Sequence, residues 1–194
     1  MRLRISDHPS LEKASHYAGL FKRDRRGVSA VEFAFILPTI MIPLYFGAVE
    51  VSEALTVDRR ITSIASTVAD LTAQAEEVDS GQVNQIFDAA RSIMVPYDNT
   101  GITIVLTSVV ADEDNNTTVD WSCGHGGGTT HAEGSAFTLP PNLTQPFTSV
   151  IVAEVNYTHN SFLAKVLDSP ISMKDTFYLR PRRSLTVEFT GGGC

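Results

Sequence analysis

The sequence predicts an α+β protein, in which a long N-terminal transmembrane helix continues into an amphipathic helix and leads into a small, mostly antiparallel sheet domain. Three observations support this. One apolar run, residues 28–49, carries a single charged side chain in 22 residues. Beyond it, apolar residues recur every three or four positions, as on one face of a helix. From Gly101 onward the apolar period becomes two, as in strands.

The apolar run 28–49 is long enough to span a bilayer. As a helix it would reach roughly 33 Å, and a bilayer core is about 30 Å thick. Residues 1–27 hold seven basic and three acidic side chains, whereas the rest of the chain holds 8 basic and 19 acidic ones. The positive-inside rule therefore predicts a cytoplasmic leader, 1–27, followed by the span and an extracytoplasmic remainder. A secretory signal cut after Ala48 is the competing interpretation. The apolar region of a secretory signal is usually about 7 to 15 residues, which is shorter than the run found here.

Glu32 is the one charged residue in the apolar run, four residues past Val28. A carboxylate at hydrocarbon depth costs about 2.5 to 3.5 kcal/mol, so we expect Glu32 to meet a cationic partner or to be protonated. The alternative is that its side chain extends to the cytoplasmic interface. Pro38 and Pro43 each remove a backbone donor and predict kinks in this helix.

The start of the run resembles a known family. The stretch Arg26-Gly27-Val28-Ser29-Ala30-Val31-Glu32-Phe33-Ala34-Phe35-Ile36-Leu37-Pro38 is similar to the TadE-like pseudopilins of the tight-adherence (Flp) pilus, and it resembles the type IV pilin class signal. Phe177–Arg182 resembles the family more weakly.

The resemblance implies a pilin-like fold and a prepilin peptidase that cuts between Gly27 and Val28. It also implies that Glu32 and Phe33 act in assembly, with Glu32 facing the new amine of Val28 in a neighbouring subunit. Opposite charges attract strongly in a low dielectric, and each alone would pay for desolvation. Such a pair would favour assembly in register.

Residues 50–95 form the predicted extracytoplasmic helical region. The helix is expected to continue to Val78, break at Asp79-Ser80-Gly81, and be followed by a short helix from Val83 to Met94 that ends before Pro96. We expect the apolar stripe of the first helix to pack on the protein's own sheet, with a partner surface as the alternative. The stripe consists of Val57, Ile61, Ile64, Val68, Leu71, Ala75 and Val78.

Residues 96–194 form the predicted strand-rich domain. Period-two patterns predict strands over 102–110, 117–121, 149–158, 176–179 and 184–189. Residues 112–116 read as a hairpin turn, and the Gly-, Thr- and Pro-rich stretch 122–146 reads as a surface loop. Four or five strands with the preceding helices are enough for one small α+β domain.

Cys123 and Cys194 are the two cysteines, and both fall on the predicted oxidising side of the membrane. We therefore expect an intramolecular disulfide, which would contribute on the order of 4 kcal/mol by closing a loop of about 70 residues. Free thiols, a metal pair and intermolecular bridges are the alternatives.

The segment Cys123–His131 is the only one that suggests chemistry. It offers a cysteine and two histidines as metal ligands, and its His-Gly-Gly-Gly resembles an esterase oxyanion loop. However, the sequence has no Gly-x-Ser-x-Gly elbow and no convincing fourth ligand. The acidic external part also lacks the basic footprint of nucleic-acid binding, and Asp112–Asp114 lack EF-hand spacing. We expect no enzymatic activity, catalytic residue, cofactor, metal or nucleic-acid partner.

The resulting functional expectation is a membrane-anchored TadE-like minor pseudopilin that takes part in assembly of a tight-adherence pilus for surface adhesion. It would lie in the bacterial inner membrane with a periplasmic C-terminal domain. Its partners would be membrane lipid, a prepilin peptidase, other pilins or pseudopilins, and pilus assembly proteins. The alternative is an uncleaved single-pass protein whose external domain binds a ligand or envelope partner. A third class is a membrane-tethered hydrolase that uses the Cys123–His131 loop.

Overall fold

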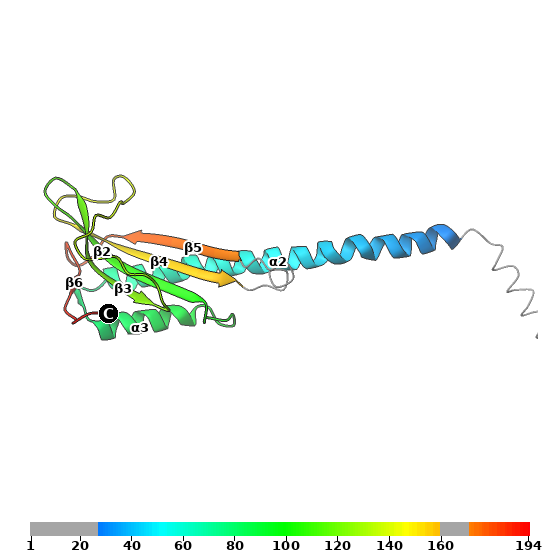
Figure 1. Cartoon of the computed structure of the whole chain (residues 1–194), viewed down its shortest axis with the longest axis horizontal. Helices are drawn as coiled ribbons and strands as arrows, with labels where there is room; N and C mark the ends of the chain where they lie inside the picture. Colours follow the sequence, from blue (N-terminus) through cyan, green and yellow to red (C-terminus); the bar gives the residue numbers. More distant parts are fainter. Residues whose placement is uncertain (1–26, 160–170) are drawn as a thin grey trace, which may run out of the picture. The chain divides into compact units, whose positions relative to one another are not determined.

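The computed structural model describes residues 27–159 and 171–194, so all of the basic leader except Gly27 lies outside the described residues (Figure 1). The described residues fall into two compact units, 27–49 and Glu50–Cys194. The first described helix, α2 (Val28–Ala73), begins in the first unit and ends in the second. The second unit contains the rest of the elements and is called the head unit below. The architecture is α+β, as the sequence predicted.

The head unit is built on a four-stranded sheet with the order β3-β2-β4-β5, in which all neighbours are antiparallel. Its strands are β2 (Ile102–Ala111), β3 (Thr117–His125), β4 (Ser149–His159) and β5 (Ile171–Leu179). The strands predicted over 102–110 and 149–158 are thus present almost as expected. A second, two-stranded parallel sheet pairs β1 (Glu77–Val78) with β6 (Glu188–Phe189).

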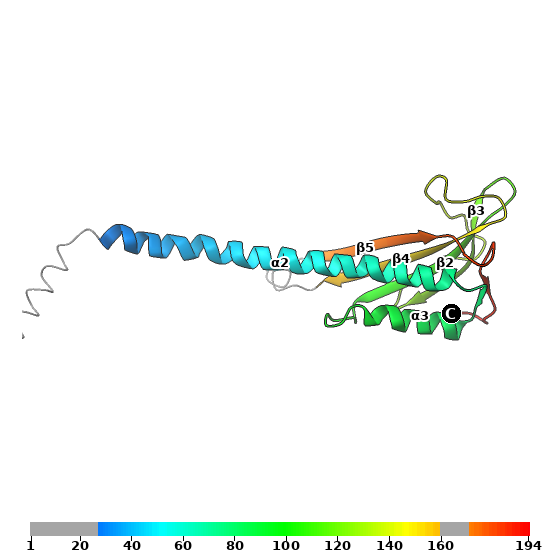
Figure 2. The ribbon, with the colours of Figure 1, turned by 180° about the vertical axis from the view of Figure 1, so that it is seen from behind.

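The main core lies between one face of the sheet and two helices, α3 (Ser80–Ser92) and the part of α2 that belongs to the head unit. Within the head unit, Figure 1 views the sheet in front of α2 and Figure 2 views α2 in front of the sheet. Val57, Ile61, Ile64 and Val68 are all fully buried in this core. The prediction that the apolar stripe packs on the protein's own sheet is therefore confirmed.

The opposite face of the sheet is covered as well. Val109, Val150 and Val152 are buried there. The residues packed over them include Phe137, Leu139 and Leu143, which belong to the segment predicted as a surface loop. Both faces of the central strands are therefore apolar, which explains why β2 and β4 are nearly continuous in buried residues.

The structure corrects the end of the long helix. Helix α2 ends at Ala73, and Val78 is not on its stripe but in β1, where it pairs with Phe189. Leu71, also assigned to the stripe, is 38% exposed. The expected break at Asp79 is instead the start of α3, because Asp79 is its N-cap. The predicted strand 184–189 shrinks to Glu188–Phe189, whose parallel partner lies far away in the sequence.

Two strands are longer than predicted. β5 starts at Ile171 rather than at 176, and β3 continues through Cys123 to His125, which the sequence analysis assigned to a loop. A glycine occupies position 124 of this strand because there is no room for a side chain. A Cβ on Gly124 would lie 2.6 Å from the carbonyl oxygen of Gly128. Glycine here permits close packing rather than flexibility.

Candidate functional site

The predicted processing and assembly residues lie together at the start of α2. Gly27 directly precedes the helix, Val28 is its first residue, and Glu32 follows one turn later, about 6 Å further along the axis. Glu32 and Phe33 are exposed, with Phe33 at 63%. A cut after Gly27 would place a new amine at the first residue of the helix. The backbone N–H groups of this N-terminal turn have no partners within the helix.

The helix beyond Glu32 exposes a continuous apolar surface. Among the described residues, one helix is long and apolar enough to cross a membrane, and it lies near the N-terminus. Pro38 and Pro43 lie inside it, and the helix continues through both. Its exposed apolar side chains can contact lipid or other helices. They are Val31, Phe33, Phe35, Ile36, Leu37, Ile40, Met41, Ile42, Leu44, Tyr45, Phe46 and Val49.

Residues 27–70 match the family model of TadE-like proteins. This segment is therefore similar to TadE-like proteins. The match begins at Gly27 and contains every residue singled out for processing and assembly, so it confirms the resemblance drawn from the sequence. It ends before β1 and does not extend to the strand-rich part of the chain. No curated protein sequence and no solved structure matches the chain.

Arg60 fixes the last part of the TadE-like segment to the head unit. Its guanidinium donates to the carbonyl oxygens of Ile93 and Val95 just past α3, and it lies 5.2 Å from the ring centroid of Tyr97. Arginine suits this position because its planar fork can donate twice while its face stacks on an aromatic ring. Arg60 was not predicted from the sequence, because it stands off the apolar stripe and its partners are distant in sequence.

The C-terminal arginines form a second attachment to the helical region. Arg182 pairs with Asp70 of α2, and its backbone N–H donates to the carbonyl oxygen of Ala73 at 2.9 Å. Arg183 pairs with Glu76 at 3.1 Å. Exposed ion pairs contribute little each, about 0 to 1 kcal/mol, so they serve chiefly to set the position of the C-terminal segment.

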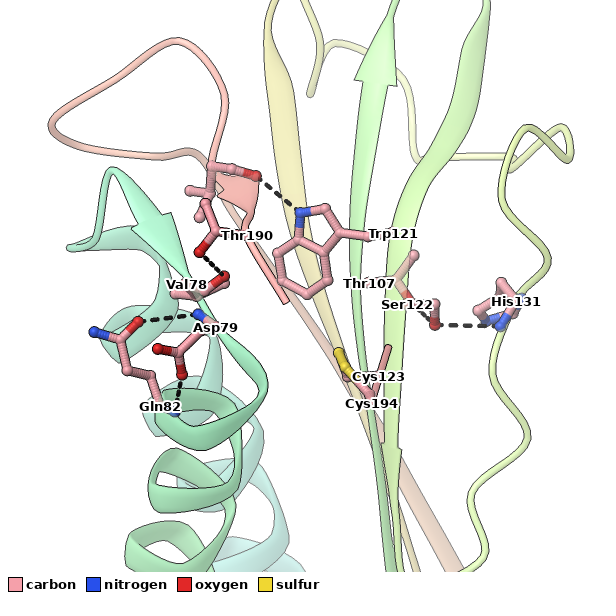
Figure 3. Close-up of a disulfide and its surroundings, with 11 residues drawn as sticks. Val78, Asp79, Gln82, Thr107, Trp121, Ser122, Cys123, His131, Thr190 and Cys194 are labelled. Atoms are coloured by element: carbon pink, nitrogen blue, oxygen red, sulfur yellow. Dashed lines mark hydrogen bonds between the residues drawn. A yellow bond between two sulfur atoms is a disulfide. The ribbon is translucent and has the colours of Figure 1, made fainter. Parts of the chain in front are cut away.

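A disulfide joins Cys123 of β3 to Cys194, with their Cα atoms 5.2 Å apart (Figure 3). The pairing expected from the compartment is thus present in the structure. Beside it, the indole Nε1 of Trp121 donates to the carbonyl oxygen of Val187 at 2.8 Å, and its ring packs on Phe189. These contacts hold the last segment of the chain along β3.

The disulfide removes the chemistry that the Cys123–His131 segment suggested. Cys123 is neither a free nucleophile nor a metal ligand. The ring of His125 packs against Phe87, and the N–H of Gly128 donates to the carbonyl oxygen of His125 instead of pointing to an oxyanion. Gly126 adopts a positive φ of 66° and lies directly against β2. These glycines shape a tight turn.

His131 does take part in a polar cluster, with two partners that the sequence analysis did not identify. One ring nitrogen of His131, Nε2, lies 2.7 Å from Glu154, and the Lys174 ammonium donates to the same carboxylate at 3.2 Å. Burial raises the pKa of Glu154, but the hydrogen bonds from His131 and Lys174 outweigh it, and the net pKa is lowered. The cluster holds the 126–148 segment against the outer face of β4 and β5.

Asp112 is explained by the hairpin turn in which it lies. Its carboxylate accepts from the backbone and the side-chain amide of Asn116, at 2.7 and 2.9 Å, and these hydrogen bonds lower its pKa. Such a carboxylate caps its own turn, and the turn needs no ion to close it.

Proposed function

We propose that this chain is a membrane-anchored minor pseudopilin of the TadE-like kind, which takes part in assembling a tight-adherence pilus for surface adhesion. The match over residues 27–70 associates it with that pilus in general terms. The finer role is our inference. In it, a prepilin peptidase removes the basic leader, α2 enters a membrane or filament bundle, and the head unit is presented on the periplasmic side of the inner membrane.

One observation carries the proposal. Glu32 is an exposed carboxylate on an otherwise apolar, exposed helical surface, one turn after the residue that processing would make the N-terminus. A carboxylate at hydrocarbon depth must meet a cation or be protonated, and the described part of the first unit offers no basic side chain. An ammonium on Val28 of a neighbouring subunit would supply that charge. Phe33, next to Glu32, would contribute apolar contact area.

Mass spectrometry of the mature N-terminus tests the processing step. Under the proposal, the chain isolated from a host with an active prepilin peptidase begins at Val28. A Gly27→Leu variant, which blocks a small-residue cleavage site but leaves the span apolar, should begin at Met1. A wild-type chain that retains Met1 alongside that peptidase would overturn the proposal in favour of an uncleaved single-pass anchor.

Substitution of Glu32 tests the assembly step. Glu32→Gln keeps the shape of the side chain and removes its charge, so we expect normal membrane insertion but loss of co-purification with other pilus subunits. Asp58→Asn is the matched control, because Asp58 is an exposed acid on the same helix but outside the expected span. Undiminished assembly by Glu32→Gln would contradict the proposed pairing and leave Glu32 a side chain that reaches the interface.

A further inference from the structure

We propose that Glu50, Glu53 and His159 form a binding site for a divalent transition-metal ion such as Zn²⁺. Each of the three offers one ligand atom, and these atoms all lie within 4.8 Å of one another. Two come from α2 and the third from the last residue of β4, and all three belong to the head unit. The sequence analysis predicted no metal ligand, since the helix and the histidine are far apart in the chain.

The two glutamates occupy the positions at which the apolar stripe of α2 would continue. The stripe runs backwards from Val68 through Ile64 and Ile61 to Val57 in steps of three and four. The next steps of four and three reach Glu53 and then Glu50. Residues three apart in a helix lie on one face, so both carboxylates face the same side as the buried stripe. At this end of the stripe, carboxylates replace apolar side chains.

His159 occupies the matching position on the sheet. Alternate residues of a strand share a face, and Ile151, Ala153, Val155 and Tyr157 of β4 all belong to the main core. His159 is the next member of that row and is 6% exposed. The apolar rows on the helix and on the strand thus both change to ligand-bearing side chains at the same end of the core.

The Nε2 atom of His159 is buried and has no hydrogen-bond partner in the described part of the chain. An unsatisfied buried polar atom costs about 1 to 3 kcal/mol, and such atoms in native proteins call for a ligand or water. Two carboxylates near one point also repel each other, and a dication relieves that repulsion. Among the described residues, the buried Nε2 of His159 thus has no hydrogen-bond partner at the point where two carboxylates come together. A metal ion would bind that nitrogen and balance the negative charge of the carboxylates.

The donor set indicates the class of ion. One imidazole nitrogen and two carboxylate oxygens suit Zn²⁺ and its first-row neighbours, with water completing the coordination. Ca²⁺ is disfavoured because it takes six to eight oxygen ligands. A bound ion would join α2, one residue after the expected span, to the end of β4. It would therefore fix the helix to the sheet where the apolar contacts stop.

Calorimetric titration of Zn²⁺ into the full chain tests the site. The protein should carry no polyhistidine tag, be held in detergent micelles and be stripped of metal with a chelator. We expect one ion per chain, with Mn²⁺ weaker than Zn²⁺ and no saturable binding of Ca²⁺. His159→Gln and Glu53→Gln should each weaken Zn²⁺ binding by about tenfold or more. With Co²⁺, the visible bands of bound ion should appear in wild type and be lost in both variants.

His131→Gln is the matched control, because His131 also faces a carboxylate but its Nε2 is already held by Glu154. It should bind Zn²⁺ like wild type. If burial makes His159→Gln misfold, as judged by the fluorescence of Trp121, then Glu53→Gln decides, since Glu53 is exposed. Absence of saturable Zn²⁺ binding in wild type, or equal binding in wild type and Glu53→Gln, would overturn the proposal.

Discussion

Asp79 determines where α3 begins. Its side chain accepts from the backbone N–H of Gln82 at 2.7 Å, and the Gln82 side chain accepts from the backbone N–H of Asp79 at 3.0 Å. Two of the donors that a helix leaves unpaired at its start are thereby satisfied. The sequence Asp79-Ser80-Gly81 contains this signal, which the sequence analysis took for a break.

Asp79→Ala should lower the free energy of unfolding by about 1 kcal/mol, because loss of an N-cap costs about 0.5 to 2 kcal/mol. Urea denaturation of the full chain in micelles measures the loss. Trp121, the one tryptophan of the sequence and a buried residue, is the fluorescence probe. Asp114→Ala, in an exposed turn, is the control and should change stability little. Equal effects of the two substitutions would show that the cap contributes nothing particular.

Glu154 makes the stability of the head unit depend on pH. Its native pKa lies below the ordinary value of 4.5, although burial raises it, because His131 and Lys174 donate to the carboxylate. A depressed pKa gives stability that is present above the unfolded-state pKa and lost as the pH falls through the native one. We expect Glu154→Gln to cost on the order of 1 kcal/mol at neutral pH, with the difference from wild type vanishing in acid.

Asp120 provides a comparison of opposite sign. Burial raises its pKa above 3.8, and the charges of Glu133 and Glu188 raise it further. Its charge therefore destabilises the native state above that pH, and Asp120→Asn should stabilise the protein at neutral pH but not in acid. Thermal unfolding of both variants across the acid range is the measurement. A Glu154→Gln deficit that stays constant with pH would contradict the role given to the carboxylate.

At the scale of elements, local periodicity predicted what local contacts determine. The stripe from Val57 to Val68 identified the buried face of α2, and the alternation from Ile102 identified β2. Val78 shows where such reasoning stops. It falls at the right spacing for the stripe, but it lies in β1. There it pairs with Phe189 of β6, a strand near the other end of the chain. No local pattern contains that partner.

Two glycines, Gly124 and Gly128, show the same limit of local sequence patterns. Gly124 and Gly128 were both assigned to a surface loop, whereas Gly124 lies in β3, and a Cβ at either position would come too close to backbone or to a neighbouring side chain. The sequence shows where the glycines are, but it does not show which neighbouring atoms would clash with a side chain there. The candidate sites divide in the same way. Gly27, Val28 and Glu32 form a local motif and could be proposed from the sequence, whereas the contacts of Arg60, Glu154 and His159 involve residues distant in sequence.

The docking of α2 on the sheet can be tested with Ile61. It is fully buried in the main core, so Ile61→Ala removes apolar contacts and leaves a cavity. Such substitutions cost about 2 to 5 kcal/mol. Leu71→Ala is the control, because Leu71 is on the same helix but 38% exposed, and we expect a far smaller loss. Urea denaturation followed by circular dichroism compares them. A loss at Leu71 as large as that at Ile61 would contradict the assigned buried face.

At the scale of the whole molecule, a helix that could span a membrane lies near the N-terminus, and a disulfide lies in the part of the chain that follows it. Both features bear on the membrane orientation of the protein. A disulfide persists in an oxidising compartment. Positive charge in the leader predicts that everything after the span reaches such a compartment. The pairing of Cys123 with Cys194 agrees with the proposed periplasmic head unit, so the oxidation state of these cysteines in cells tests the proposed orientation.

Whole cells that produce the full chain are denatured in the presence of a thiol-blocking reagent, freed of that reagent, and labelled with a maleimide polymer with or without prior reduction. We expect label only after reduction, because both cysteines are paired. Cys194→Ser supplies the control, since Cys123 is then free and should be blocked at the first step. Replacing both cysteines by alanine should cost about 4 kcal/mol, the loop-closure value for a sequence separation of 71. Free thiols in untreated wild-type protein would place the head unit in the reducing cytoplasm and contradict the membrane orientation.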